Sequence, residues 1–221
     1  MLNLRRGVVG VVAVLLVGAA GACAGGFSSP CPSGQELREE RHDDATSIKA
    51  RGCVGTDSED NYRRQGHREF FHSNGQKEAE GSYVDGFQGG ETGVTGILID
   101  GREGAWMFWH EDGQKSDETT YRDGEREGLL TRWHENGQKE AEGTWRDGEL
   151  EGLDTMWHDN GQKSLEWTFR DGELEGLWTG WHDNGQKSEE STYLNGTRTA
   201  VTEWDANGTQ TTPRIRLGLL R

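Results

Sequence analysis

The feature that most constrains this chain is a short pattern, His-x-(Asn/Asp)-Gly-Gln-Lys, that returns at a fixed interval. Its glycines are Gly75, Gly113, Gly137, Gly161 and Gly185. The last four are spaced 24 residues apart, and a degenerate copy of the pattern follows at 205–210. A fixed interval of this length indicates a repeat architecture, in which each unit packs only against its neighbours. The period therefore outranks any local propensity in predicting the fold.

Each unit contains two turn signals. One is the Asn-Gly or Asp-Gly of the pattern, and the other is a second dipeptide such as Asp147-Gly148. Both are typical of type I′ hairpin turns, because Asn, Asp and Gly tolerate the positive φ that such turns need. Two turns per unit leave two short strands. The sequence therefore predicts an all-β fold, an extended antiparallel array of β-hairpins with about 24 residues per unit.

Within each predicted strand, apolar and polar residues alternate. The apolar sets of one unit are Leu129, Thr131 and Trp133 in its first strand and Ala141, Gly143 and Trp145 in its second. Period two with one apolar face predicts a meander that buries that face by stacking units. We expect a structural ladder of aromatic residues along the stack. Its members are Phe71, Trp109, Trp133, Trp157 and Trp181, flanked by Tyr121, Trp145, Phe169 and Tyr193.

The N-terminus has the pattern of a secretion signal, which we assign to residues 1–22. Arg5 and Arg6 precede an apolar run that is too short to span a bilayer, and small residues follow it. Cys23 comes next, and its surroundings resemble the lipobox of bacterial lipoproteins, although Ala20 stands where that family usually has Leu. We expect acylation of Cys23 and a location at the bacterial cell envelope, on its periplasmic or outer-membrane face. The alternative is ordinary signal-peptidase cleavage before Cys23.

Acylation of Cys23 would leave Cys31 and Cys53 as an even pair in an oxidising compartment, so we expect a disulfide between them. The alternative is two free cysteines in a flexible segment. The expected organisation of the chain is then a lipid-anchor linker with a two-cysteine lead-in at 23–61 and repeats at 62–210. An insertion at 87–100 accounts for the longer step from Gly75 to Gly113, and 211–221 form a C-terminal tail.

The formal net charge of -15 argues against nucleic acid as a partner, because a field of that sign repels phosphates. The chain contains no sequence motif of a catalytic site, and we expect neither enzymatic activity nor a cofactor. We expect no metal site either. Histidines in register lie about 10 Å apart in a hairpin stack, too far for one ion to bridge. Acidic turns such as 147–151 could hold calcium loosely, but a solvated turn edge is the plainer expectation.

The residues also support a resemblance to a family. Gly104-x-Trp106, Gly176-x-Trp178 and the run from Trp157 to Lys163 look like MORN-type repeats, and the resemblance covers residues 62–210. The closer likeness is to the bacterial variant class, which is often labelled as the antitoxin component of toxin–antitoxin modules. The segment from Cys31 to Cys53 also resembles the two-cysteine lead-in of exported lipoproteins with such arrays. The 87–100 insertion is absent from the family pattern.

These observations predict a membrane-tethered binding or scaffold protein with a protein or polymeric ligand. The candidate contact residues are Trp106 and Trp178, which we expect to be exposed on the face opposite the aromatic ladder. The alternative for these two is a second packed face against the N-terminal segment or the insertion. Alternative functions are an antitoxin or immunity-type protein that neutralises a toxin, and a purely structural envelope component.

Overall fold

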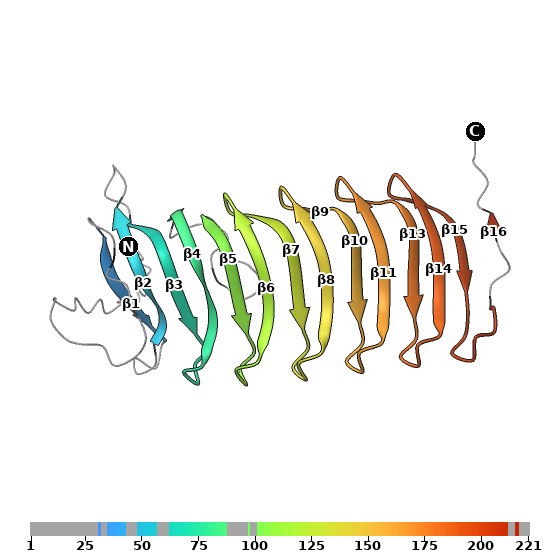
Figure 1. Ribbon diagram of the computed structural model, residues 1–221, viewed down its shortest axis with the longest axis horizontal. Coiled ribbons are helices and arrows are strands. Elements are labelled where there is room, and N and C mark those ends of the chain that lie inside the picture. The colour runs from blue at the N-terminus through green and yellow to red at the C-terminus, as the bar shows by residue number, and fades with distance from the viewer. Residues whose placement is uncertain are drawn as a thin grey trace, which may run out of the picture.

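The computed structural model describes residues 31, 35–42, 48–56, 62–87, 97, 101–211 and 215–216. Over these residues the chain forms one antiparallel sheet, in which neighbours in sequence are neighbours in space (Figure 1). The prediction of an extended hairpin array is confirmed. The expected signal segment and Cys23 lie outside the described residues. Within the described part of the chain, no helix is long and apolar enough to cross a membrane.

The strands follow the order of the repeats. Before the insertion they are β1 (Glu36–Arg41), β2 (Ile48–Thr56), β3 (Tyr62–Phe71) and β4 (Lys77–Phe87). The middle of the array has β5 (Arg102–Trp109), β6 (Lys115–Arg122), β7 (Glu125–Trp133), β8 (Lys139–Arg146), β9 (Glu149–Leu150), β10 (Gly152–Trp157) and β11 (Lys163–Arg170). The C-terminal strands are β12 (Glu173–Leu174), β13 (Gly176–Trp181), β14 (Lys187–Leu194), β15 (Thr197–Glu203) and β16 (Ile215–Arg216).

The two turns of each unit differ in type. At Asp147-Gly148 both residues have positive φ, 48° and 79°, and Arg146 pairs with Glu149 across a two-residue loop. This is the type I′ geometry that the sequence predicts. At the repeated pattern, by contrast, the amide of Gly137 donates to the His134 carbonyl at 2.9 Å.

The prediction of a type I′ turn is therefore wrong at the repeated pattern. The loop is a type I turn over 134–137 whose last residue, Gly137, has a φ of 79°. Asn136, by contrast, is not among the described residues that have a positive φ. The reason is a local hydrogen bond, since the Asn136 side-chain oxygen accepts the amide of Gln138 at 2.9 Å. Such an Asx turn replaces the need for a left-handed Asn.

The register of the hairpins places the predicted apolar sets on two different faces. Leu130 pairs with Gly143 and Arg132 with Ala141, whereas Thr131 pairs with Glu142. Directly paired residues share a face of an antiparallel sheet. The second-strand set that ends at Trp145 therefore lies on the face of Leu130, which we call the core face. The first-strand set that ends at Trp133 lies on the other, the outer face.

The prediction of a single apolar face is thus wrong. The outer-face leucines Leu129, Leu153 and Leu177 are more than half exposed. Alternation shows which residues of one strand share a face, but the turn decides which sets of neighbouring strands coincide. Here Leu129 pairs with Thr144 and Thr131 with Glu142, so the first-strand set lies opposite polar residues of the second strand.

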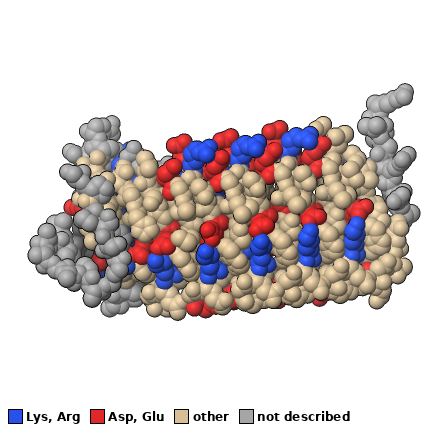
Figure 2. Space-filling model, in the orientation of Figure 1, with Lys and Arg blue, Asp and Glu red and all other residues tan. Residues whose placement is uncertain are grey.

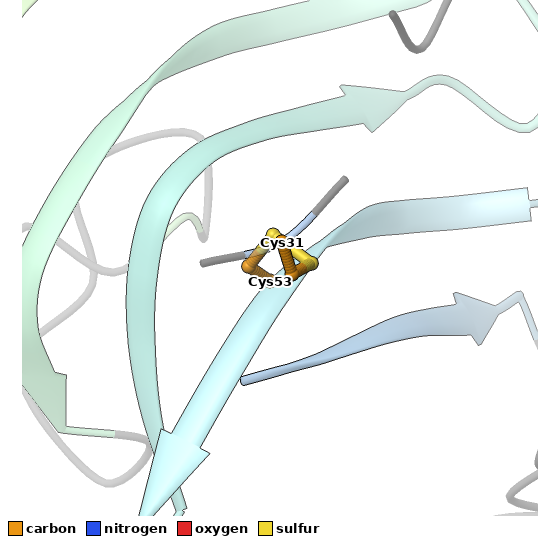
Figure 3. The surroundings of a disulfide bond; sticks show 2 residues. All are labelled: Cys31 and Cys53. Carbon is orange, nitrogen blue, oxygen red and sulfur yellow. A yellow bond between two sulfur atoms is a disulfide. The ribbon is translucent and has the colours of Figure 1, made fainter. Parts of the chain in front are cut away.

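The sheet begins before the predicted start of the repeats. Strands β1 and β2 pair with each other, and β2 pairs with β3. Cys31 and Cys53 form the expected disulfide, with Cα atoms 5.6 Å apart. Figure 3 shows the neighbouring strands curving around this bond. The lead-in is therefore an integral end of the array.

Candidate binding surface

The repeated histidines bind the units to one another. In each case Nε2 donates to the main-chain carbonyl of the aromatic residue that precedes the next unit's turn. The pairs are His72 with Trp109, His110 with Trp133, His134 with Trp157, His158 with Trp181 and His182 with Trp204, at 2.9–3.1 Å. His42 makes the same bond to Phe71 at 2.9 Å. This histidine ladder spans the whole array.

His42 begins the ladder although it precedes the repeats predicted at 62–210. Its signal is present in the sequence, since His42-Asp-Asp matches the first three residues of the later turns. The bonds join residues 22 to 37 apart, so they are not local to one turn. The repeated histidine is a connection between units.

The other polar residues of the repeat make similar connections. The side-chain amide of Asn136 donates to the Asp159 carbonyl of the next turn at 2.6 Å. At the opposite edge, Glu127 Oε2 accepts the amide of Asp147 at 3.2 Å, and equivalent bonds join Glu103, Glu151 and Glu175 to the turns that follow them. The acidic turns are therefore held together by main-chain amides. Among the turn glycines, a Cβ on Gly161 would come within 2.4 Å of Gln138 Oε1 in the preceding unit.

The outer face carries tryptophan and lysine in alternation. The ammonium groups of Lys77, Lys115, Lys139 and Lys163 lie 5.3–5.8 Å from the ring centres of Trp109, Trp133, Trp157 and Trp181. Each lysine also pairs with a glutamate three residues on, as in Lys139 with Glu142 at 2.6 Å. Figure 2 shows the resulting rows of basic and acidic side chains along this face.

The expected ladder of aromatic rings is corrected accordingly. Trp133 and its equivalents are separated by lysines, and they lie on the outer face with Leu129 and Thr131. Trp145 and its equivalents Tyr121, Phe169 and Tyr193 lie on the core face. The outer-face rings are therefore linked by cation–π contacts rather than by direct stacking.

The hydrophobic core is concentrated at the N-terminal end of the core face. Its cluster is Ala50, Phe70, Ala79, Tyr83, Ile97, Trp106, Phe108 and Tyr121. Trp106 is 0 % exposed, so the expectation of an exposed contact residue there is wrong. Ile97, from the predicted insertion, is only 5 % exposed and covers this part of the sheet. The packed-face alternative is the one that the structure supports for Trp106.

A buried arginine and a cluster of ion pairs lie at this end. Arg68 donates to Glu40 at 2.9 Å, and burial lowers the pKa of its guanidinium despite that partner. Within the described residues, ligand atoms of His67, Glu69 and Glu80 lie within 4.8 Å of one another. Lys77 binds both carboxylates, at 3.0 and 2.6 Å. A cation of the protein thus already occupies the place that a metal ion would take.

Beyond this core the same face is open. A cavity of about 130 Å³ lies over β7, β8 and β10, and its lining includes Arg126, Leu130, Trp145 and Asp154. Asp154 accepts the Trp167 indole N–H at 2.9 Å, and desolvation raises the pKa of its carboxyl group. Trp178 lies farther along, half-buried, with its ring 6.5 Å from that of Trp167. Of the two predicted contact residues, Trp178 is the one that faces this open part.

The two faces differ in how strictly they repeat. On the outer face, equivalent positions hold Trp, Lys and Glu in unit after unit. On the core face the residue changes, and one series of equivalent positions is Trp106, Leu130, Asp154 and Trp178. A second series is Phe108, Arg132, Met156 and Gly180. The constant positions are the ones that join units, so the core face is where the units are free to differ.

The comparison with known families agrees with this geometry. The model of the MORN repeat variant matches residues 64–85, 126–147 and 174–195. Each match covers one hairpin, from its first strand through the histidine turn to its second strand. No curated protein matches the chain. Three of the hairpins therefore match MORN-type repeats of the variant kind.

Proposed function

We propose that the protein is a non-enzymatic binding or scaffold protein that recognises a protein or polymeric ligand through its core face. The observation that supports this proposal is that the two faces have different roles: one joins the units and the other varies between them. The outer face and the turns use their polar groups to join units, as His134 does with Trp157. The core face varies from unit to unit and leaves aromatic groups such as Trp145, Trp167 and Trp178 only half-buried. Repeat arrays use such extended surfaces for recognition.

The proposal also includes a location. The N-terminal sequence supports export and acylation of Cys23, so the array would be tethered to the bacterial envelope. The disulfide between Cys31 and Cys53 is consistent with an oxidising compartment. It lies eight residues after Cys23, close to the proposed anchor.

Intact mass spectrometry of the membrane-purified protein tests the anchor. We expect a diacyl or triacyl modification on Cys23. The Cys23→Ser variant should lack this modification and should be released from the membrane. An unmodified chain that begins at Ala24, or at Cys23 with a free amine and thiol, would refute the tether.

Affinity capture from envelope extract tests recognition. The purified protein should retain a specific partner, and Trp167→Ala on the core face should lose it. Leu153→Ala is the matched control, because Leu153 is 56 % exposed on the outer face. Circular dichroism confirms that both variants are folded. If no specific partner is retained, the protein is a structural component of the envelope; if only Leu153→Ala loses the partner, recognition uses the outer face.

A further inference from the structure

Ile97 shows how an aliphatic side chain and its main-chain carbonyl are held on the core face. Ile97 lies against Trp106 and the rest of the core cluster. Arg102 donates from Nη2 to the Ile97 carbonyl at 2.9 Å and from Nη1 to the Tyr121 hydroxyl at 2.8 Å. Its guanidinium also lies 4.5 Å from the centre of the Trp106 ring and 5.0 Å from that of Tyr121. An aliphatic side chain and a main-chain carbonyl are thus recognised together.

The same arrangement recurs one unit later without an occupant from the described residues. Arg126 is equivalent to Arg102 and lies 4.7 Å from the centre of the Trp145 ring, which is equivalent to Tyr121. Arg126 lines the cavity of about 130 Å³. Among the residues that the structure describes, none makes a hydrogen bond or ion pair with its guanidinium.

The cavity lies where a smaller residue replaces a larger one. Leu130, in its lining, stands where the preceding unit has Trp106. Leu130, Ala141, Leu150 and Met156 give the cavity apolar walls. Its volume is close to the roughly 150 Å³ at which an apolar cavity accepts a benzene-sized group. An aliphatic side chain of ordinary size therefore fits.

We propose that this cavity binds an extended segment of a partner protein, which inserts an aliphatic side chain and offers a main-chain carbonyl to Arg126. The proposal rests on the proposed binding function and names its partner class. Arg126 would hold that carbonyl as Arg102 holds the carbonyl of Ile97. Asp154, on another wall of the cavity, supplies a carboxylate that can accept a main-chain N–H of the same segment.

Selection of a displayed random heptapeptide library on the full-length protein tests this proposal. We expect enriched peptides to share one Ile, Leu, Val or Met. Isothermal titration with the synthetic peptides should give a dissociation constant that rises about tenfold or more in Arg126→Ala, as expected for loss of a hydrogen bond from a charged group. Leu130→Trp should abolish binding, because it restores the bulk that Trp106 has one unit earlier. Replacing the shared aliphatic residue by Ala should also abolish it.

Arg170→Ala is the control, since Arg170 is exposed at the turn edge and should leave the affinity unchanged. Urea midpoints of the variants verify folding. Failure to enrich any peptide, or peptides that bind wild type and Leu130→Trp equally, would overturn the proposal. A partner captured from envelope extract that is lost with Trp167→Ala but retained by Leu130→Trp would overturn it too, and would leave the proposed binding function standing.

Discussion

Removing one member of the histidine ladder should weaken the whole array. His134→Ala deletes the 2.9 Å bond from Nε2 to the Trp157 carbonyl. A hydrogen bond contributes a net ~0.5–1.5 kcal/mol to folding, and a carbonyl left without a partner in a partly buried place costs about 1–3 kcal/mol. We therefore expect the free energy of unfolding to fall by about 1–3 kcal/mol. The bond joins two units, so the loss weakens an interface and not only a loop.

Urea unfolding, followed by tryptophan fluorescence and far-ultraviolet circular dichroism, measures this loss. With a slope of ~2 kcal/mol per molar urea, the midpoint should fall by roughly 0.5–1.5 M. His67→Ala is the control, because the His67 side chain is 49 % exposed and stands outside the ladder. Its effect should stay within about 0.5 kcal/mol. Equal midpoints for wild type and His134→Ala would refute the assignment of the histidines to inter-unit bonding.

The remaining predictions concern single features of the array. Gly161→Ala should destabilise more than Gly152→Ala in urea unfolding, because both have a φ near 80° but only a Cβ at 161 meets the glutamine of the preceding unit; equal losses would contradict this. Reduction of the Cys31–Cys53 bond, which spans 22 residues, should lower the free energy of unfolding by about 3.4 kcal/mol by the loop-entropy relation, measured with and without dithiothreitol. Asp154→Asn should raise the urea midpoint at pH 8. Burial raises the pKa of this carboxyl above its value in the unfolded chain, so its ionisation destabilises the fold once the pH exceeds that unfolded pKa. The increase in urea midpoint should therefore shrink as the pH is lowered toward 4. An increase that is constant with pH would show that ionisation is not its cause.

The sequence determined the architecture of this protein. The 24-residue period and two turn dipeptides per unit predict the order of the strands within the repeats, because each signal is local and recurs. The Asp147-Gly148 turn follows directly from its residue types. The pairing of Cys31 with Cys53 was also accessible, since the expected acylation of Cys23 leaves only these two cysteines to pair.

The tertiary structure decided which face each residue occupies and what each repeated residue does. The pairing of Thr131 with Glu142 puts the set that ends at Trp133 on the outer face, away from Trp145, and alternation within a strand carries no information about that pairing. The burial of Trp106 depends on Ile97, whose position no periodic pattern specifies, because the insertion occurs once. The bond from His134 to the next unit depends on the distance between stacked turns. All three are contacts between separate segments of the chain. A repeat pattern in the sequence predicts the units themselves but not these contacts.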